Sequence, residues 1–178
     1  MILSDFDLEN LINGKRLIIK PLDREIIREN GIDLRLSGDI ARHNEKLGKD
    51  FVIDPSNADH VSKEYIVEKD NEKMVVRPHE QVLLSTVEYV KMPDNLIGFV
   101  ELRSTWARHG LIVPPTIIDV GFEGTITLEV FNSSMHAISL TPGIRFAHVI
   151  FATTLSHVKN SYSGAYSGQV GVRLPKVL

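Results

Sequence analysis

Along most of the chain, apolar and polar residues alternate with a period of two, which is typical of half-buried β-strands. Gly, Pro, Asn or Asp stands at most joins between these stretches. The alternating stretches predict nine strands: Leu17–Lys20, Ile32–Leu36, Glu64–Glu68, Met74–Arg77, Gln81–Val90, Leu96–Leu102, Thr125–Asn132, Ile138–Leu140 and Arg145–Ala152. Short strands separated by turns favour an all-β sandwich or barrel over βαβ units.

The first residues follow a helical spacing instead. Ser4 is a suitable N-cap, Asp5 and Asp7 fall in the first turn, and Gly14 is a natural stop. Four apolar residues recur at helical intervals between them: Phe6, Leu8, Leu11 and Ile12. We therefore expect a short N-terminal helix.

Two segments have no apolar period. Residues 42–63 are charged and turn-forming, which predicts a long surface excursion with little regular structure, either a plain solvated loop or a functional lid. Residues 161–178 begin with a run rich in Gly and Ser that cannot pack a core by itself. We expect one domain over residues 1–178, with a flexible tail at 161–178.

Composition narrows the function classes. A chain of 178 residues, 43% hydrophobic, buries a full core, and no apolar run spans a bilayer. The start lacks a basic region followed by an apolar segment, so we expect a cytoplasmic protein without a membrane partner. The absence of cysteine excludes disulfides, thiol nucleophiles and thiolate zinc sites. The net charge of −3 and dispersed basic residues argue against a nucleic-acid partner.

Residues 101–110 combine groups that suit phosphate binding. Ser104 is a possible N-cap for a short helix that ends at Gly110, and such a helix presents free backbone N–H groups near Ser104 and Thr105. Arg103 flanks this helix start. The segment is either a phosphate site or an ordinary capped turn with solvated arginines.

Two carboxylates lie in the next segment, residues 113–132. Glu129 alternates with Ile126, Leu128 and Val130 and shares its side of the predicted strand with Thr125, Thr127 and Phe131. It lies either on a solvent face or in a pocket where burial adjusts its proton affinity. Asp119 either begins a turn or holds a sugar hydroxyl or a metal-bound water.

Both segments resemble the signature blocks of the dCTP deaminase branch of the dUTPase-like superfamily. The matching runs are Arg103-Ser-Thr-Trp-Ala-Arg108 and Ile118-Asp-Val-Gly-Phe-Glu-Gly-Thr-Ile-Thr-Leu-Glu129. Further similar segments occur in the family order: Ile2–Leu8, Gly31–Leu36, Pro142–Arg145 and the tyrosine-serine-glycine tail.

The resemblance implies an all-β distorted jelly roll of the dUTPase-like type, a β-sandwich with a short N-terminal helix and a second short helix after Leu102. It also implies a homotrimer with nucleotide sites between subunits. The implied reaction is zinc-independent hydrolysis of dCTP to dUTP and ammonia, with Mg²⁺ bound through the triphosphate and dTTP as a candidate inhibitor. The implied fold, assembly and chemistry are expectations for this chain.

The resemblance also implies site residues. Glu129 corresponds to the general base and acid, while Ser104 and Arg108 orient the attacking water. Triphosphate binding falls to Arg103, Ser104 and Thr105, and Asp119 holds the deoxyribose. The remaining expected contacts are Thr127 and Leu128 at the pyrimidine and Tyr162, Tyr166 and Gln169 in the tail.

Composition agrees with a zinc-free reaction if the chain is a deaminase, since it has no cysteine and its seven histidines form no i, i+4 pair. Three alternatives remain. A bifunctional enzyme would also cleave dUTP to dUMP and pyrophosphate. A pure dUTPase would leave Glu129 without a purpose, and this chain has Phe122 where those enzymes usually have a pocket tyrosine. A non-catalytic nucleotide-binding trimer would bind dCTP without turnover.

Some positions depart from the family pattern. Pro115-Thr116-Ile117 replaces the usual wall of the base pocket, and His148 stands where many relatives have Gln. Ala165 falls where a phosphate-binding Lys is frequent, so the γ-phosphate is held more weakly or by another cation.

Overall fold

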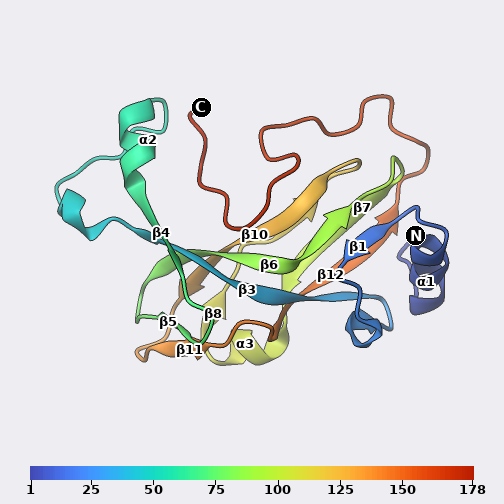
Figure 1. The fold of residues 1–178 in the computed structure, drawn as a ribbon, viewed down its shortest axis with the longest axis horizontal. Coiled ribbons are helices and arrows are strands. Elements are labelled where there is room, and N and C mark those ends of the chain that lie inside the picture. Colours follow the sequence, from blue (N-terminus) through green and yellow to red (C-terminus); the bar gives the residue numbers. More distant parts are fainter.

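A curled ten-stranded sheet forms the body of the protein, in a computed structural model that describes residues 1–178 (Figure 1). Its main path is, in order, β8 (Leu111–Ile112), β10 (Glu123–Asn132), β6 (Gln81–Lys91), β3 (Gly31–His43), β12 (Arg145–Thr153), β7 (Leu96–Leu102) and β9 (Thr116–Ile118). Three strands pair beside this path: β1 (Ile18–Lys20) on β6, and β2 (Ile27–Arg28) and β4 (Tyr65–Lys69) on β3. A separate two-stranded sheet joins β5 (Met74–Val76) to β11 (Ile138–Leu140).

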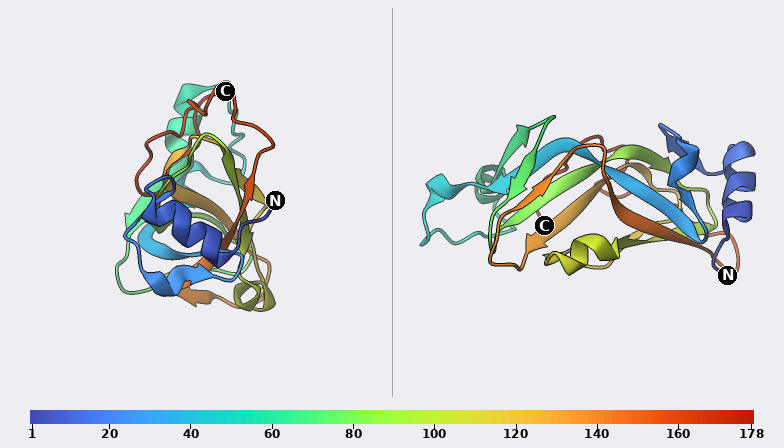
Figure 2. Two further views of the ribbon diagram at one scale, coloured as in Figure 1. Left: turned by 90° about the vertical axis from the view of Figure 1, so that its right-hand side faces the viewer. Right: turned by 90° about the horizontal axis from the view of Figure 1, so that it is seen from below.

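Strand β3 belongs to both halves of the curled sheet. Its first residues pair with β12, and its later residues pair with β6 and β4, with a register shift between Leu36 and Ile40. All pairings between the named strands are antiparallel. The sheet therefore wraps around an interior, seen end-on in the left view of Figure 2, and 28 buried apolar residues fill that interior.

Strand β10 shows the predicted alternation. Ile126, Leu128 and Val130 are buried in the core, whereas Thr127 and Glu129 are only half-buried. Thr125 departs from the prediction because it is buried, and a register shift against β6 lies between it and Thr127. The irregular step breaks the strict period of two at this one residue.

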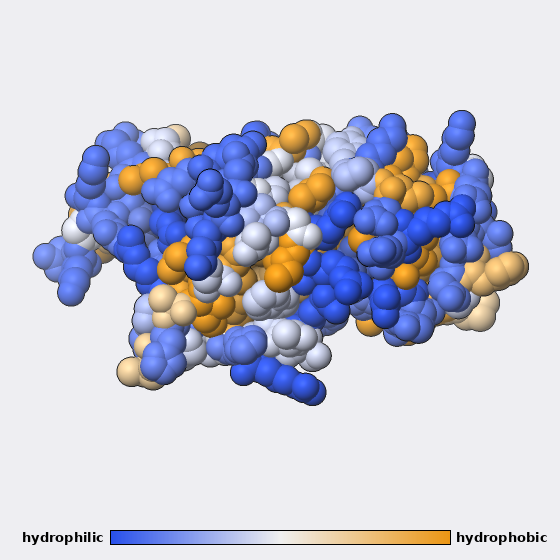
Figure 3. Space-filling model, turned by 60° about the horizontal axis from the view of Figure 1, so that its bottom comes forward, coloured by the Kyte–Doolittle hydropathy of each residue, from blue (hydrophilic) through white to orange (hydrophobic).

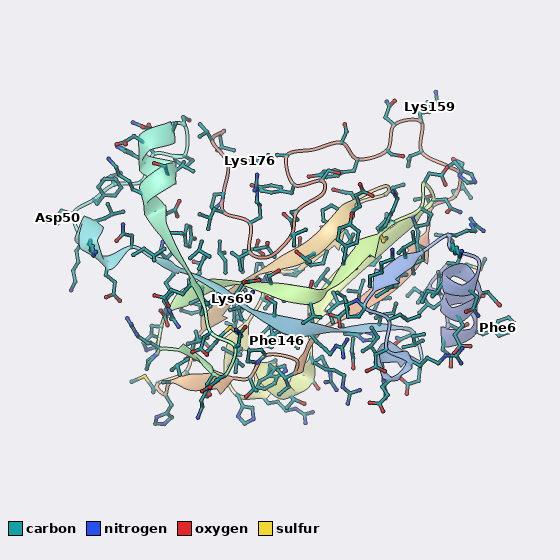
Figure 4. The ribbon with its side chains drawn as sticks, viewed as in Figure 1. Phe6, Asp50, Lys69, Phe146, Lys159 and Lys176 are labelled. Carbon is teal, nitrogen blue, oxygen red and sulfur yellow. The ribbon has the colours of Figure 1, made fainter.

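The N-terminal helix is confirmed as α1 (Asp5–Asn13). The Ser4 side chain accepts from the Asp7 backbone N–H, the Asp7 side chain accepts from the Ser4 N–H, and Gly14 is the C-cap. Leu8 is fully buried. Phe6 was expected on the packed face, but it is 70% exposed and points away from the body, whereas Phe146 lies inside it (Figure 4).

The segment predicted as an irregular excursion contains more structure than expected. Strand β3 extends to His43, and the segment then holds η2 (Glu45–Leu47) and α2 (Ala58–Glu64). The Asn57 side chain caps α2 by accepting from two backbone N–H groups. The sequence also gave no prediction of η1 (Arg24–Ile26), β2, β8 or β9.

The short helix after Leu102 is present as α3 (Ser104–Arg108), but its cap differs from the prediction. Arg103 is the N-cap, no side chain caps the helix, and Ser104 is its first residue. The Ser104 hydroxyl is therefore free to point outward, because it is not needed to cap the helix.

The tail from residue 161 lies along β10 and ends near the excursion, as the red segment of Figure 1 shows. The backbone N–H of Thr125 donates to the Gln169 carbonyl over 2.9 Å, and the Leu178 N–H donates to the Pro55 carbonyl over 3.1 Å. The all-β prediction is confirmed. No helix in the chain is long and apolar enough to cross a membrane.

Candidate functional site

A cavity of about 420 Å³ opens beside β10 under the tail. Its walls come from β4, β6, β7, β9, β10 and the tail. Six residues that the sequence analysis assigned to substrate binding line it: Asp119, Thr127, Glu129, Tyr162, Tyr166 and Gln169. Strand alternation explains the presence of Thr127 and Glu129, because both face away from the core.

Glu129 faces this cavity rather than open solvent. It is half-buried and opposite Leu83 in the register of β10 with β6. Tyr65 from β4 lines the same cavity, and its hydroxyl lies 3.3 Å from His43 Nε2. Burial raises the pKa of Tyr65 to about 12, and the negative charges of Glu64 and Glu129 add to the shift. The cavity wall thus combines the Glu129 carboxylate with a phenol that stays protonated.

Asp119 occupies the turn after β9. Its carbonyl accepts from the Phe122 N–H over 3.1 Å, so the residue begins a turn, and it is exposed at the cavity wall. Both interpretations left open for Asp119 fit this position. Phe122 packs on Tyr162 with ring centroids 5.9 Å apart, which brings an aromatic wall from the tail to the turn.

Gln169 joins the tail to β10 and leaves one atom unpaired. Its side-chain Nε2 donates to the Thr125 carbonyl over 2.7 Å. Its Oε1 is buried and has no hydrogen-bond partner. A buried acceptor without a partner is costly, so this oxygen suits a ligand N–H or O–H group.

A second, more open hollow of about 330 Å³ holds the phosphate-binding candidates. Arg103, Ser104 and Thr105 line it together with Asp33 and His148. Ser104 and Thr105 are exposed, and Arg103 is half-buried. The expected triphosphate-binding residues therefore meet in one place, but not in the cavity of Glu129.

The two hollows share no lining residue within one chain. Val100 of β7 lines the cavity, whereas the next two residues, Glu101 and Leu102, line the second hollow. Arg108 is exposed and lines neither space. Leu128 was expected at the pyrimidine, but its side chain is fully buried in the core and is not part of the cavity wall.

Sequence reasoning missed several lining residues. Gln81, Leu83 and Tyr65 enter the cavity because β4 and β6 pair with β3 beside β10, which no local pattern indicates. Arg173 and Pro175 enter it from the tail, where the sequence has no period to place them. Arg173 is the one basic residue in the cavity wall.

The chain contains no group of three or more His, Cys, Asp and Glu side chains placed to hold a metal ion. The Asp33 carboxylate accepts from His148, with 2.9 Å between Asp33 Oδ1 and His148 Nδ1. The protein side chains alone thus form no metal cage, and a magnesium ion here would depend on ligand oxygens.

The curled antiparallel sheet carries a cavity lined by acidic and aromatic side chains. A cavity of this kind is typical of a protein that binds a small polar ligand. The dCTP deaminase-like family matches residues 2–154, so the chain belongs to this family. The predicted resemblance is thereby confirmed.

Several curated relatives match nearly the whole chain. The dCTP deaminase of Sulfurisphaera tokodaii is 47% identical over 176 residues, covering 99% of this chain and 92% of that protein. The dCTP deaminase of Acidianus ambivalens is 48% identical over 178 residues, covering 99% and 98%. A protein of Sulfolobus islandicus rod-shaped virus 1, named a probable deoxyuridine 5'-triphosphate nucleotidohydrolase, is 43% identical over 176 residues, covering 99% of each.

Among solved structures, the 2'-deoxycytidine 5'-triphosphate deaminase of Agrobacterium tumefaciens has a TM-score of 0.66 and 19% identity. The match covers 84% of this chain, which corresponds to 46% of the length of that chain. At this identity the likeness concerns the fold alone.

Proposed function

We propose that this protein converts dCTP and water to dUTP and ammonia without zinc, as a step of pyrimidine deoxynucleotide metabolism. The observation that carries the proposal is the position of Glu129, half-buried in a cavity with Asp119, Thr127 and the unpaired acceptor of Gln169. The dCTP deaminases that match the chain over nearly its full length support the choice of substrate.

The carboxylate of Glu129 acts as base and then as acid. It takes a proton from water as the water oxygen bonds to C4 of the pyrimidine, and it gives this proton to ring N3. It then takes the remaining proton from the hydroxyl group of the adduct and passes it to the amine, so that C4=O forms as the amine departs. The C4–N bond of the tetrahedral adduct then breaks and ammonia leaves. Ser104 and the guanidinium of Arg108 hold the water and stabilise the negative charge that develops.

Because Glu129 and Ser104 line different hollows in one chain, we propose that each site forms between neighbouring copies of a homotrimer. Large apolar side chains are exposed on strands near both hollows, for example Phe99, Ile112 and Ile117 at 38%, 51% and 53%. Orange apolar patches also interrupt the hydrophilic surface on the face shown in Figure 3. Exposed apolar patches of this kind suit contact between copies.

We further propose that residues 161–178 close over the bound nucleotide. The backbone N–H of Arg173 donates to Thr127 Oγ1 over 3.0 Å, so the tail already contacts a strand of the cavity. Arg173 brings a positive charge to the cavity, and this charge takes the place of the lysine that Ala165 replaces. Mg²⁺ enters with the triphosphate oxygens and offsets their charge.

Glu129→Gln tests the proton-transfer role. The amide keeps the shape but cannot accept and return the proton, so kcat for ammonia release from dCTP should fall about 10²-fold or more, with KM changed little. Glu123→Gln is a matched control on the same strand, since Glu123 pairs with Lys91 at 2.7 Å outside the cavity and its loss should leave kcat unchanged. Near-normal ammonia release by Glu129→Gln would overturn the assignment.

Mixed oligomers test whether sites are shared. Glu129→Gln and Ser104→Ala chains are each expected to be nearly inactive alone. When they are refolded together in equal amounts, about a quarter of the sites of a cyclic trimer contain both intact residues, so activity should return to that extent. If Glu129 and Ser104 worked within one chain, mixing would restore no activity.

A bifunctional reaction is the second candidate, favoured by the viral relative named a probable dUTP nucleotidohydrolase. Such an enzyme would go on to cleave dUTP to dUMP and pyrophosphate. Chromatography of the products from dCTP and Mg²⁺ separates the outcomes: dUTP and ammonia for the deaminase, or dUMP, pyrophosphate and ammonia for the bifunctional enzyme.

A further inference from the structure

A buried carboxylate lies beneath the second hollow. The Asp33 side chain on β3 is 3% exposed and has three partners from other segments. His148 Nδ1 lies 2.9 Å from one carboxylate oxygen, and Arg145 Nη1 and Arg103 Nε lie 3.5 Å and 3.6 Å from the other. A buried carboxylate is stable only when it is paired, so this cluster is a defined arrangement rather than a loose surface contact.

The cluster fixes the Arg103 guanidinium on two sides. Its Nε faces Asp33, and its Nη1 donates to the Arg145 carbonyl over 3.3 Å. Trp106 Nε1 donates to the same carbonyl over 3.0 Å, which holds that carbonyl in place. The backbone N–H of Arg103 also donates to the Phe146 carbonyl over 3.1 Å. These contacts engage Nε and Nη1 but not Nη2, so one donor edge of a fixed guanidinium remains for a ligand.

The charge in the cluster does not cancel. Two guanidinium groups, those of Arg103 and Arg145, share the single carboxylate of Asp33, which leaves an excess of positive charge beside the hollow. Three acidic residues line the same hollow: Asp33, Glu29, which lies 3.5 Å from Arg28, and Glu101. Glu101 offsets the excess positive charge of the cluster, so what the hollow offers an anion is a fixed guanidinium donor rather than a net positive charge.

We infer that Asp33 is a positioning residue that orients Arg103 to bind the triphosphate of the nucleotide. The inference rests on the proposed function for the identity of the anion. It goes further in assigning a role to a buried residue that touches no substrate: Asp33 limits Arg103 to one direction, so the guanidinium does not have to be ordered when the anion binds.

Whether Asp33→Asn weakens or tightens anion binding distinguishes a positioning role of Asp33 from simple charge neutralisation. If Asp33 only cancelled positive charge, its removal would leave two guanidinium groups uncompensated and would tighten binding of an anion. If it positions Arg103, binding weakens despite the added positive charge. We expect Kd for inorganic triphosphate to rise about tenfold, the scale of one lost charge-assisted hydrogen bond.

Calorimetric titration of the full chain with inorganic triphosphate measures this, in wild type, Asp33→Asn, Arg103→Ala and the double variant. We expect Asp33→Asn to weaken triphosphate binding when Arg103 is present and to have no further effect in the Arg103→Ala variant. Glu88→Gln is the matched control, because Glu88 is another fully buried carboxylate that accepts from an arginine, with Arg35 Nε at 2.6 Å, away from the hollow. It should lower thermal stability without changing Kd.

Asp33→Glu keeps the charge in case Asp33→Asn does not fold. Its longer side chain displaces the Arg103 contact, so its loss of affinity should also vanish in the Arg103→Ala background. Unchanged or tighter binding by either folded variant, or an equal loss with and without Arg103, would overturn the inference. A wild-type protein that binds triphosphate but releases no ammonia from dCTP would refute the proposed function and leave this test intact.

Discussion

The tail is anchored by a small apolar cluster that is separate from the main core. Ala41, Tyr65 and Leu83 are buried on the cavity side of the sheet, and Val172 and Leu174 of the tail pack against them. Figure 4 shows the tail, with Lys176 labelled, passing over this side of the ribbon. Shortening one tail side chain should therefore release the tail without disturbing the main core.

Leu174→Ala is the chosen perturbation. Leu174 is half-buried, so its side chain contributes roughly 1 kcal/mol, about half of what full burial of a leucine provides. A loss of about 1 kcal/mol changes the ratio of undocked to docked tail about fivefold. The main-core residues keep their contacts, so global stability should change little.

Hydrogen exchange of the Arg173 backbone N–H measures the docked state, because this group donates to Thr127 Oγ1 over 3.0 Å only when the tail lies on β10. We expect its exchange rate to rise about fivefold in Leu174→Ala. Val170→Ala is the control, since Val170 is in the same tail but 77% exposed and should change nothing. An unchanged rate in Leu174→Ala, or equal increases in both variants, would refute the proposed anchor.

Two further predictions concern the sheet. A Cβ at Gly31 would lie 2.2 Å from the Val149 carbonyl oxygen and 2.5 Å from His148 Nε2. Gly31→Ala should therefore lower the free energy of unfolding, measured by urea denaturation, by about 3 kcal/mol. A loss below about 1 kcal/mol would contradict this. Burial raises the pKa of Tyr65 to about 12, so the folded state holds the phenol proton more tightly than the unfolded state does. The stability that the protonated phenol contributes is therefore lost as pH rises from about 10 to about 12. Over that range, wild type should lose roughly 2–3 kcal/mol more stability in urea than Tyr65→Phe does, and parallel pH curves would contradict the shift.

The local features of the fold were predictable because their causes are local. The cap at Ser4 and the alternation along 126–130 depend on residues within a few positions, and both are present as expected. Strands β8 and β9 were missed because no alternation of apolar and polar residues indicates them, and pairing with β10 and β7 defines them. The seven-residue helix α2 lies in a charged stretch without an apolar period, and only its cap at Asn57 indicates a helix.

The site was predictable only in part, for the same reason. The family motifs named most residues of the cavity wall, but no local signal places Tyr65 beside Glu129, because the two lie on strands separated by two others in the sheet. The contact of Asp33 with His148 joins residues 115 positions apart. Motifs therefore identified chemical groups, and the topology decided which groups share a space.

The double membership of β3 also has a consequence for how the chain folds during synthesis. Besides β2 and β4, residues 31–43 need partners from β6 at 81–91 and from β12 at 145–153, so β12 is made long after β3. Pairings between such distant segments form slowly, because a long loop must close first. On the ribosome, one edge of the first half of β3 thus remains unpaired until β12 has emerged, and a chaperone that shields exposed strands would act in that interval.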